Sequence, residues 1–224
     1  MKNKKVLSMV AALGLVAVVG IGGTLAYFND QTDTLTNTFT MAEQGIEMEL
    51  WESSVMSDGN GGYRQNSRGP RVVAGETVVE GEAAGIAYEE LQPGADVYKD
   101  PTVTIKANSV NCYVYASIQT DNDAKNTISE INDAWEVLET SDNGDGTMTT
   151  YYVYGTVEQP TEVEKNTQDQ NLTPLFTNVE IATDVTDPTT ELGDIIIKSA
   201  AVQSSNIQPS EANNEGLRLL KGIQ

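Results

Sequence analysis

Strict alternation of apolar and polar side chains over residues 110–119 constrains the fold more than any other feature of this 224-residue chain. One set of side chains is aliphatic or small and consists of Val110, Cys112, Val114, Ala116 and Ile118. The intervening set is Asn111, Tyr113, Tyr115, Ser117 and Gln119. Successive side chains of a β-strand point to opposite faces of its sheet, so this segment is predicted to be a strand with one face in a core.

The same period recurs along most of the chain. It is found at residues 35–41, 46–51, 103–105 and 135–139. Residues 149–157, rich in tyrosine and valine, and the apolar run at 195–202 are further predicted strands, and turns rich in Gly, Pro, Asn and Asp separate the segments. About nine short strands with such connections predict an all-β antiparallel sandwich rather than a parallel α/β fold. The pattern does not separate a jelly roll from an immunoglobulin-like sandwich.

Two segments have helical signals. Thr127 and Glu130 have the spacing of a capping box, which predicts a short helix over 126–134. Pro209 precedes a leucine-containing segment, which predicts a final short helix over 209–221. All other regular structure after residue 26 is expected to be strand.

Two glycine-rich segments are predicted to be connections. Residues 57–70 contain few aliphatic side chains and are interpreted as a flexible loop. They can bury too little apolar surface to offset the conformational entropy that ordering the segment would cost. With Arg64, Arg68 and Arg71, segment 57–71 is the one basic patch of the sequence, interpreted as a solvated loop or a partner-binding site. Residues 142–146 are predicted to be a hairpin turn, because an EF-hand alignment places Tyr152 where a bidentate glutamate belongs.

Cys112 is the only cysteine, so an internal disulfide is excluded. Its place in the aliphatic set predicts a buried thiol that behaves as a small hydrophobe. A nucleophilic role or an intermolecular disulfide is the alternative. The chain has no histidine that could activate the sulfur, and burial raises the pKa of a thiol.

Composition narrows the classes of function. The chain has 33 acidic and 13 basic residues and a net charge of −20, which makes nucleic acid and anionic lipid poor partners. The carboxylates are expected to form a solvated surface with at most weak Ca²⁺ association. The absence of histidine removes Ser-His-Asp, Cys-His and H-E-x-x-H sites. We therefore predict no catalytic residue, no dedicated metal site and no cofactor.

The N-terminus has the pattern of an export signal. Three lysines, Lys2, Lys4 and Lys5, precede an uncharged and largely apolar run at 6–21. Small residues at Thr24 and Ala26 predict cleavage after Ala26, so that residues 1–26 are a signal peptide and the mature chain begins at Tyr27. The alternative is a retained anchor, since residues 6–26 match the roughly 20 residues that a membrane helix needs.

Four stretches resemble a known family. They are GGTLAYFNDQTDTLTNTFTMAEQGIEMEL at 22–50, LQPGADVYKDPTVTIKANSVNCYVYASI at 91–118, TPLFTNVEI at 173–181 and IIIKSAAVQ at 195–203. On these residues the chain resembles the TasA/camelysin proteins of Gram-positive bacteria. The resemblance implies a single jelly-roll domain over 27–224, secretion through a dedicated signal peptidase, and contact with the membrane only before cleavage.

The resemblance also implies a function. Proteins of this kind are structural components of the extracellular biofilm matrix, and they assemble into fibres or a surface layer when the new N-terminal segment of one copy adds as a strand to the next. Here that segment would be 27–41, with Leu35, Phe39 and Met41 as its apolar contacts. Its partner would be the protein itself, together with other matrix or cell-wall components. The alternative is that the strand stays in its own domain.

Two other functions are carried as alternatives. Camelysin-like proteins imply a cell-surface metallo-endopeptidase, for which this sequence offers no histidine ligand. A surface carbohydrate-binding module would use an aromatic platform of Tyr113, Tyr115, Tyr151, Tyr152 and Tyr154. Packing between tyrosines of neighbouring strands explains the same residues without a ligand.

Overall fold

The computed structural model describes residues 29–32, 45–74, 88, 90–187 and 189–222, and for 29–32 only the backbone. The predicted signal peptide 1–26, the cleavage residues Ala26 and Tyr27, and the predicted strand 35–41 lie outside the described residues. Within the described part the chain forms three β-sheets and one helix, which confirms the predicted all-β sandwich. The strand pairs there are antiparallel except that of β4 with β6.

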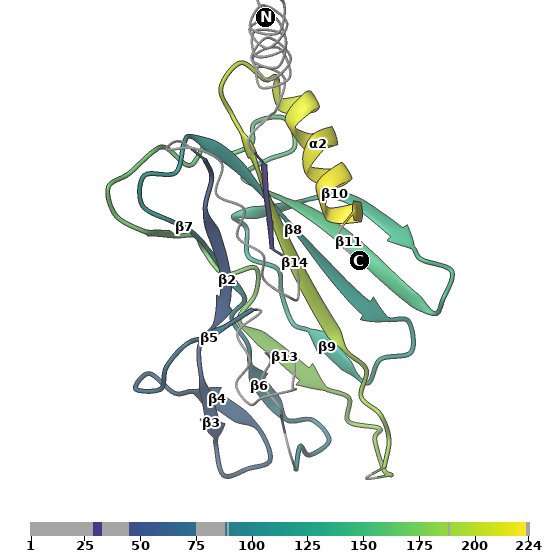
Figure 1. The fold of residues 1–224 in the computed structure, drawn as a ribbon. Coiled ribbons are helices and arrows are strands. Elements are labelled where there is room, and N and C mark those ends of the chain that lie inside the picture. The colour runs from purple at the N-terminus through teal and green to yellow at the C-terminus, as the bar shows by residue number, and fades with distance from the viewer. Residues whose placement is uncertain (1–28, 33–44, 75–87, 89, 188, 223–224) are drawn as a thin grey trace, which may run out of the picture.

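Sheet A forms one layer of the sandwich (Figure 1). In spatial order it contains β1 (Asn29–Thr32), β14 (Ile195–Gln203), β8 (Cys112–Asp121), β11 (Thr147–Tyr154) and β10 (Trp135–Asp142). The predicted turn at 142–146 connects β10 to β11 as a hairpin. Gly144 and Gly146 adopt positive φ angles of 76° and 91° there, a conformation that glycine adopts without steric cost.

Sheets B and C lie on the other side of the core. Sheet B contains β12 (Gln170–Asn171), β7 (Thr102–Ile105), β2 (Met48–Glu52) and β5 (Val72–Val73). Sheet C contains β3 (Val55–Ser57), β4 (Tyr63–Gln65), β6 (Asp96–Tyr98), β13 (Asn178–Ile181) and β9 (Asn126–Ile128).

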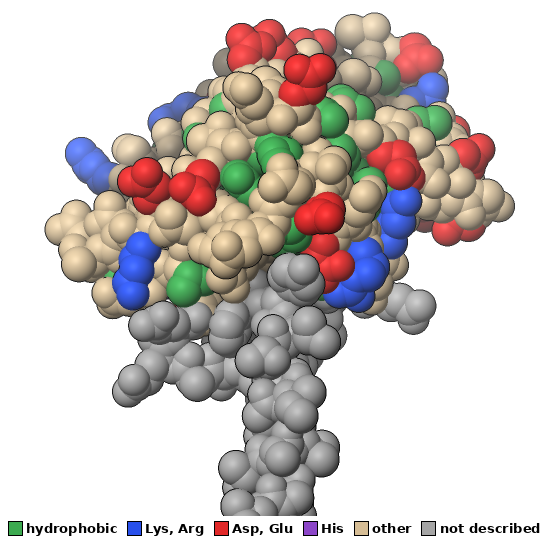
Figure 2. Space-filling view, turned by 90° about the horizontal axis from the view of Figure 1, so that it is seen from above, with side chains coloured by type: hydrophobic (Ala, Val, Ile, Leu, Met, Phe, Trp, Pro, Cys, Tyr) green, Lys and Arg blue, Asp and Glu red, His purple; other side chains and the backbone are tan. Residues whose placement is uncertain are grey.

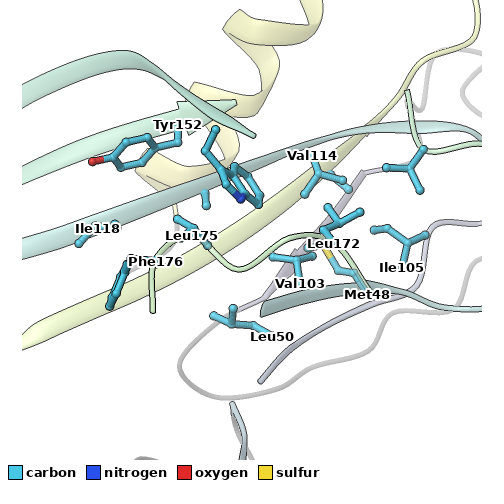
Figure 3. Close-up of a cluster of buried hydrophobic side chains, with 14 of the residues drawn as sticks. Met48, Leu50, Val103, Ile105, Val114, Ile118, Tyr152, Leu172, Leu175 and Phe176 are labelled. Carbon is cyan, nitrogen blue, oxygen red and sulfur yellow. The ribbon is translucent and has the colours of Figure 1, made fainter. Parts of the chain in front are cut away.

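The main core lies between the layers, where the aliphatic set of β8 meets β2, β7 and the segment around Leu175 (Figure 3). Cys112 and Val114 are completely buried in it, as the alternation predicts. Val103 and Ile105 contribute from β7. Apolar area removed from water here is the main source of stability, at roughly 25 cal/mol per Å².

A second core lies on the outer face of sheet A, beneath helix α2 (Pro209–Gly222) (Figure 1). The predicted C-terminal helix is therefore confirmed, and it begins at Pro209, whose missing N–H costs nothing in a first turn. Tyr115, Val153 and Val202 come from the sheet, and Leu219 and Leu220 come from the helix. The second set of side chains of β8 is thus partly covered by protein.

The predicted helix over 126–134 is wrong. Residues 126–128 instead form β9, which pairs with β13, and Asn126 Nδ2 donates to the carbonyls of Leu192 and Gly193 at 2.9 and 2.7 Å. A capping box contributes about 1 kcal/mol to a helix. Tertiary pairing of this segment outweighs that local preference.

The segment 57–70 also differs from its prediction as a loop without regular structure. It contains β4, which pairs with β3 in a short hairpin and meets β6 where Tyr63 lies opposite Val97. Asp58 Oδ1 accepts hydrogen bonds from the backbone of Asn60 and Gly62 at 2.7 and 3.0 Å and so stabilises the turn. Local hydrogen bonds and one aromatic contact, Tyr63 against Tyr88, replace the aliphatic burial that the segment lacks.

Within the described residues, no helix combines the length and the apolar character required to cross a membrane.

Candidate functional site

The two edges of sheet A are built differently, and the difference defines the candidate site. At one edge lies β10, whose pairing with β11 is interrupted by a β-bulge between Val137 and Glu139. Glu136 and Glu139 place negative charge on this strand. Bulges and charged side chains are the means by which edge strands avoid pairing with another chain.

At the other edge, β1 covers β14. Their antiparallel register places Asn29 opposite Val202 and Thr32 opposite Ser199. On its other side β14 pairs with β8 along its full length, from Ile195 to Gln203. The N-terminal segment therefore supplies the outermost described strand of this sheet, over four residues.

The part of β14 that β1 covers is buried on both faces. Ala201 packs into the main core, while Ala200 and Val202 pack under α2, and none of the three is exposed. Backbone N–H and C=O groups in such a place need a partner, because an unpaired buried group costs about as much as a lost hydrogen bond. Whatever strand lies along β14 thus completes the sheet.

The predicted assembly residues Leu35, Phe39 and Met41 lie outside the described residues, as do Ala26 and Tyr27. The structure places the backbone of 29–32, which belongs to the same predicted segment 27–41, on β14. The sequence alone did not indicate this partner strand, since no local pattern in β14 specifies its neighbour.

Of the three arginines in the predicted basic patch, one is engaged in contacts within the protein and two are exposed. The Arg71 guanidinium lies 5.2 Å from the centre of the Trp51 ring and 3.1 Å from Glu49 Oε1. Arg64 and Arg68 are exposed in the β3–β4 region. Figure 2 shows acidic side chains over the face in view with lysine or arginine side chains among them, so charge of both signs is mixed there.

The proposed tyrosine platform is wrong in its geometry. Tyr115 is completely buried under α2, and Tyr151 is 6% exposed. Tyr152 belongs to the main core, on the opposite face of the sheet. Packing within the two cores therefore accounts for these three rings, and they do not form an exposed aromatic surface.

Sequence reasoning missed one buried carboxylate. Asp100 Oδ1 accepts from the Ser53 amide at 2.7 Å, and Oδ2 accepts from Ser53 Oγ at 2.7 Å and from the Tyr98 hydroxyl at 3.0 Å. Burial and the nearby Asp100 charge raise the pKa of Tyr98 to about 12. All three donors are satisfied by one side chain, which ties β6 to the end of β2. No sequence motif marks this role.

In the part of the chain that the structure describes, no three His, Cys, Asp or Glu side chains gather closely enough to hold a metal ion. Cys112 lies in the core, where burial and the charge of Glu162 raise its pKa to about 12.

Comparison of the chain with protein-family models, curated proteins and solved structures gives no match. The resemblance to the TasA/camelysin proteins therefore rests on the four sequence stretches. All four are connected by strand pairing: β14 (195–203) pairs with β1 of 22–50 and with β8, which lies mostly in 91–118. Strand β13 of 173–181 pairs with β6 of 91–118.

Proposed function

We propose that this chain is an exported structural protein of an extracellular matrix or cell surface, which assembles with copies of itself after cleavage behind Ala26. The observation that carries the proposal is the position of the N-terminal segment on β14. The strand nearest the predicted cleavage site is also the one that completes the edge of the largest described sheet.

Assembly would proceed by exchange of this strand between copies. When β1 of one copy leaves β14, β1 of the next copy can form the same antiparallel register from Asn29 to Thr32. The ladder is chemically the same in both arrangements, so exchange of an identical element is a low-cost route to association. Leu35, Phe39 and Met41, which follow β1 in sequence, would add apolar contacts to the receiving copy.

The opposite edge supports the same proposal. The bulge and the acidic residues of β10 disfavour addition of a strand there. Growth through a single receptive edge and a single donated strand is a head-to-tail contact, which produces filaments when it does not close into a ring.

Deletion of residues 27–35 tests whether the segment is needed. We expect the purified mature protein to form fibres in negative-stain electron micrographs and the deleted protein to remain dispersed. Asp30→Pro and Gln31→Pro are finer variants, because neighbouring strand residues alternate in hydrogen bonding and proline removes the N–H. Asp30→Ala and Gln31→Ala are the matched controls. Undiminished fibres from the deleted protein would reject strand donation.

A cross-linking experiment distinguishes a donated strand from one that stays in its own domain. Gln31 and Ala200 lie opposite each other, so cysteines at both positions in a Cys112→Ala background can form a disulfide. Donation predicts a covalent ladder of multimers on a non-reducing gel after fibres are oxidised. A cross-linked monomer alone would mean that β1 remains in its own sheet.

The peptidase that the resemblance implies stays a hypothesis without a supporting observation in the structure. Protease activity of the purified protein that a chelator abolishes would establish it and would overturn the structural role as the main function.

A further inference from the structure

A small polar pocket of about 200 Å³ opens on the outer face of sheet A, next to the last residues of α2. Its walls come from β8, β11 and β14, from the β10–β11 turn and from Leu220 and Lys221 of the helix. The pocket therefore lies where the helix stops covering the sheet, on the side that faces away from the main core.

The polar groups around the pocket are held in place by a hydrogen-bond network centred on Thr147. Thr147 Oγ1 donates to Asp145 Oδ1 at 2.6 Å and accepts from Gln119 Nε2 at 3.2 Å and Asn143 Nδ2 at 2.8 Å. Asn143 Nδ2 also lies 2.9 Å from Thr149 Oγ1. The amide nitrogens are thus occupied, which leaves the amide oxygens of Gln119 and Asn143 as acceptors.

Two hydroxyls that line the pocket are free to bind a ligand. Ser117 is 3% exposed and Tyr151 is 6% exposed, and within the described structure neither hydroxyl makes a hydrogen bond. Neither oxygen is sealed from solvent, since Glu49 Oε1 is the one buried side-chain atom without a hydrogen-bond partner in the described part of the chain. Both hydroxyls can therefore exchange water for a ligand that enters the pocket.

The charges around the pocket are balanced. Lys198 and Lys221 line it, Asp145 is on its rim, and Glu139 Oε1 lies 2.6 Å from Lys221 Nζ. The Lys221 ammonium also lies 5.3 Å from the centre of the Tyr151 ring. An anion would be repelled by a chain of net charge −20, and a cation would meet two lysines. The arrangement favours a neutral ligand that both donates and accepts hydrogen bonds.

The volume sets the size of that ligand. At about 30 Å³ per water molecule, a pocket of about 200 Å³ has room for about seven waters, which is comparable to one sugar ring with its hydroxyls. We infer that this pocket binds one neutral sugar residue of a glycan, with Ser117 and Tyr151 hydrogen-bonded to its hydroxyls and Gln119 and Asn143 accepting from them. This site does not depend on the proposed self-assembly.

Titration of the full-length ¹⁵N-labelled protein with methyl glucoside, methyl galactoside and N-acetylglucosamine tests the inference. We expect saturable chemical-shift changes at Ser117, Gln119 and Thr149 with at least one of these sugars. The double variant Ser117→Ala, Tyr151→Phe retains the packed ring and removes both hydroxyls, and it should bind at least about tenfold more weakly. Ser129→Ala removes a hydroxyl directly after β9, away from the pocket, and should bind as the unchanged protein does.

Three outcomes would overturn the inference. They are the absence of saturable shifts with all three sugars, equal binding by the double variant, and saturable shifts at the same residues with inorganic phosphate but not with sugars. Near-ultraviolet circular dichroism of the double variant checks that its fold is retained, and Tyr151→Phe alone provides a second, milder variant.

Discussion

Gly216 of helix α2 lies directly against the ring of Tyr115 on β8. A Cβ atom built on Gly216 would lie 2.5 Å from Cγ and Cδ2 of that ring, well inside van der Waals contact. The Tyr115 hydroxyl donates to Asn213 Oδ1 of the same helix at 3.1 Å, and Asn213 Nδ2 donates to the Val157 carbonyl at 2.9 Å. A residue without a side chain thus lets the helix approach the sheet closely enough for these buried hydrogen bonds.

We predict that Gly216→Ala destabilises the protein by about 1–3 kcal/mol, the usual cost of overpacking a core. Alanine is a better helix former than glycine by about 1 kcal/mol, so a net loss means that the steric conflict with Tyr115 is larger than this gain. Urea unfolding measures the change. Gly222→Ala is the control, because nothing lies within 4 Å of its Cβ position, and a similar loss in that variant would contradict the explanation.

We predict that Asp100→Ala lowers the free energy of unfolding by about 3 kcal/mol. The change leaves the Ser53 amide, the Ser53 hydroxyl and the Tyr98 hydroxyl without the acceptor that they share. Asp187→Ala removes a carboxylate that accepts from exposed Thr189 instead, and it should cause a clearly smaller loss in the same urea experiment. Equal losses in the two variants would show that the Asp100 contacts contribute little.

Cys112 should be inert in the folded protein. It is fully buried, and its pKa of about 12 leaves very little thiolate near neutral pH. We expect a thiol reagent such as Ellman's reagent to react with one thiol per chain when the protein is unfolded in urea. In buffer without urea, the native protein should react only at the rate at which it unfolds. Rapid, complete reaction of the native protein would mean that the sulfur is accessible.

Stability should fall at alkaline pH. The folded pKa of Cys112, about 12, is raised above its ordinary value of 9.0, and that of Tyr98, also about 12, above 10.0. The unfolded chain therefore loses these protons first, so the stabilisation is complete below about pH 9 and is lost as the pH rises through about 12. Urea midpoints measured from about pH 8 to about pH 11 should decline, and less steeply for Cys112→Ala. A constant midpoint would contradict the raised pKa values.

Self-assembly should be faster in salt. Copies of the mature chain repel each other, because loss of the three signal lysines leaves the net charge more negative than the −20 of the full chain. The screening length falls from about 30 Å at 0.01 M to about 10 Å at 0.1 M. We expect light scattering by the mature protein to rise earlier in sodium chloride than at low ionic strength. Calcium chloride at equal ionic strength separates screening from specific binding: an equal rate supports screening, and a large additional acceleration indicates a calcium contact between copies.

Several elements followed directly from local sequence. The alternation over 110–119 predicted both the strand β8 and the burial of Cys112, because side-chain direction in a strand depends only on residue parity. Pro209 marked the start of α2 for an equally local reason, since proline fixes φ and lacks an N–H.

Other features depended on partners distant in sequence. Thr127 was expected in a helix because the capping box is a local pattern, but it lies opposite Glu180 in a strand pair. Tyr115 was expected on an outer surface, because parity says which face a side chain is on and not whether α2 covers that face. The antiparallel pairing of β1 with β14, over four residues, likewise joins segments at opposite ends of the chain.

For this protein the sequence alone determined the β-rich class, the two faces of β8 and the burial of its one cysteine, because these depend on residues within a few positions of each other. Tertiary structure decided which face of sheet A the helix α2 covers, which strand β1 pairs with and where the polar pocket lies. Those outcomes depend on contacts between segments tens of residues apart, whose free energies outweigh a local preference of about 1 kcal/mol.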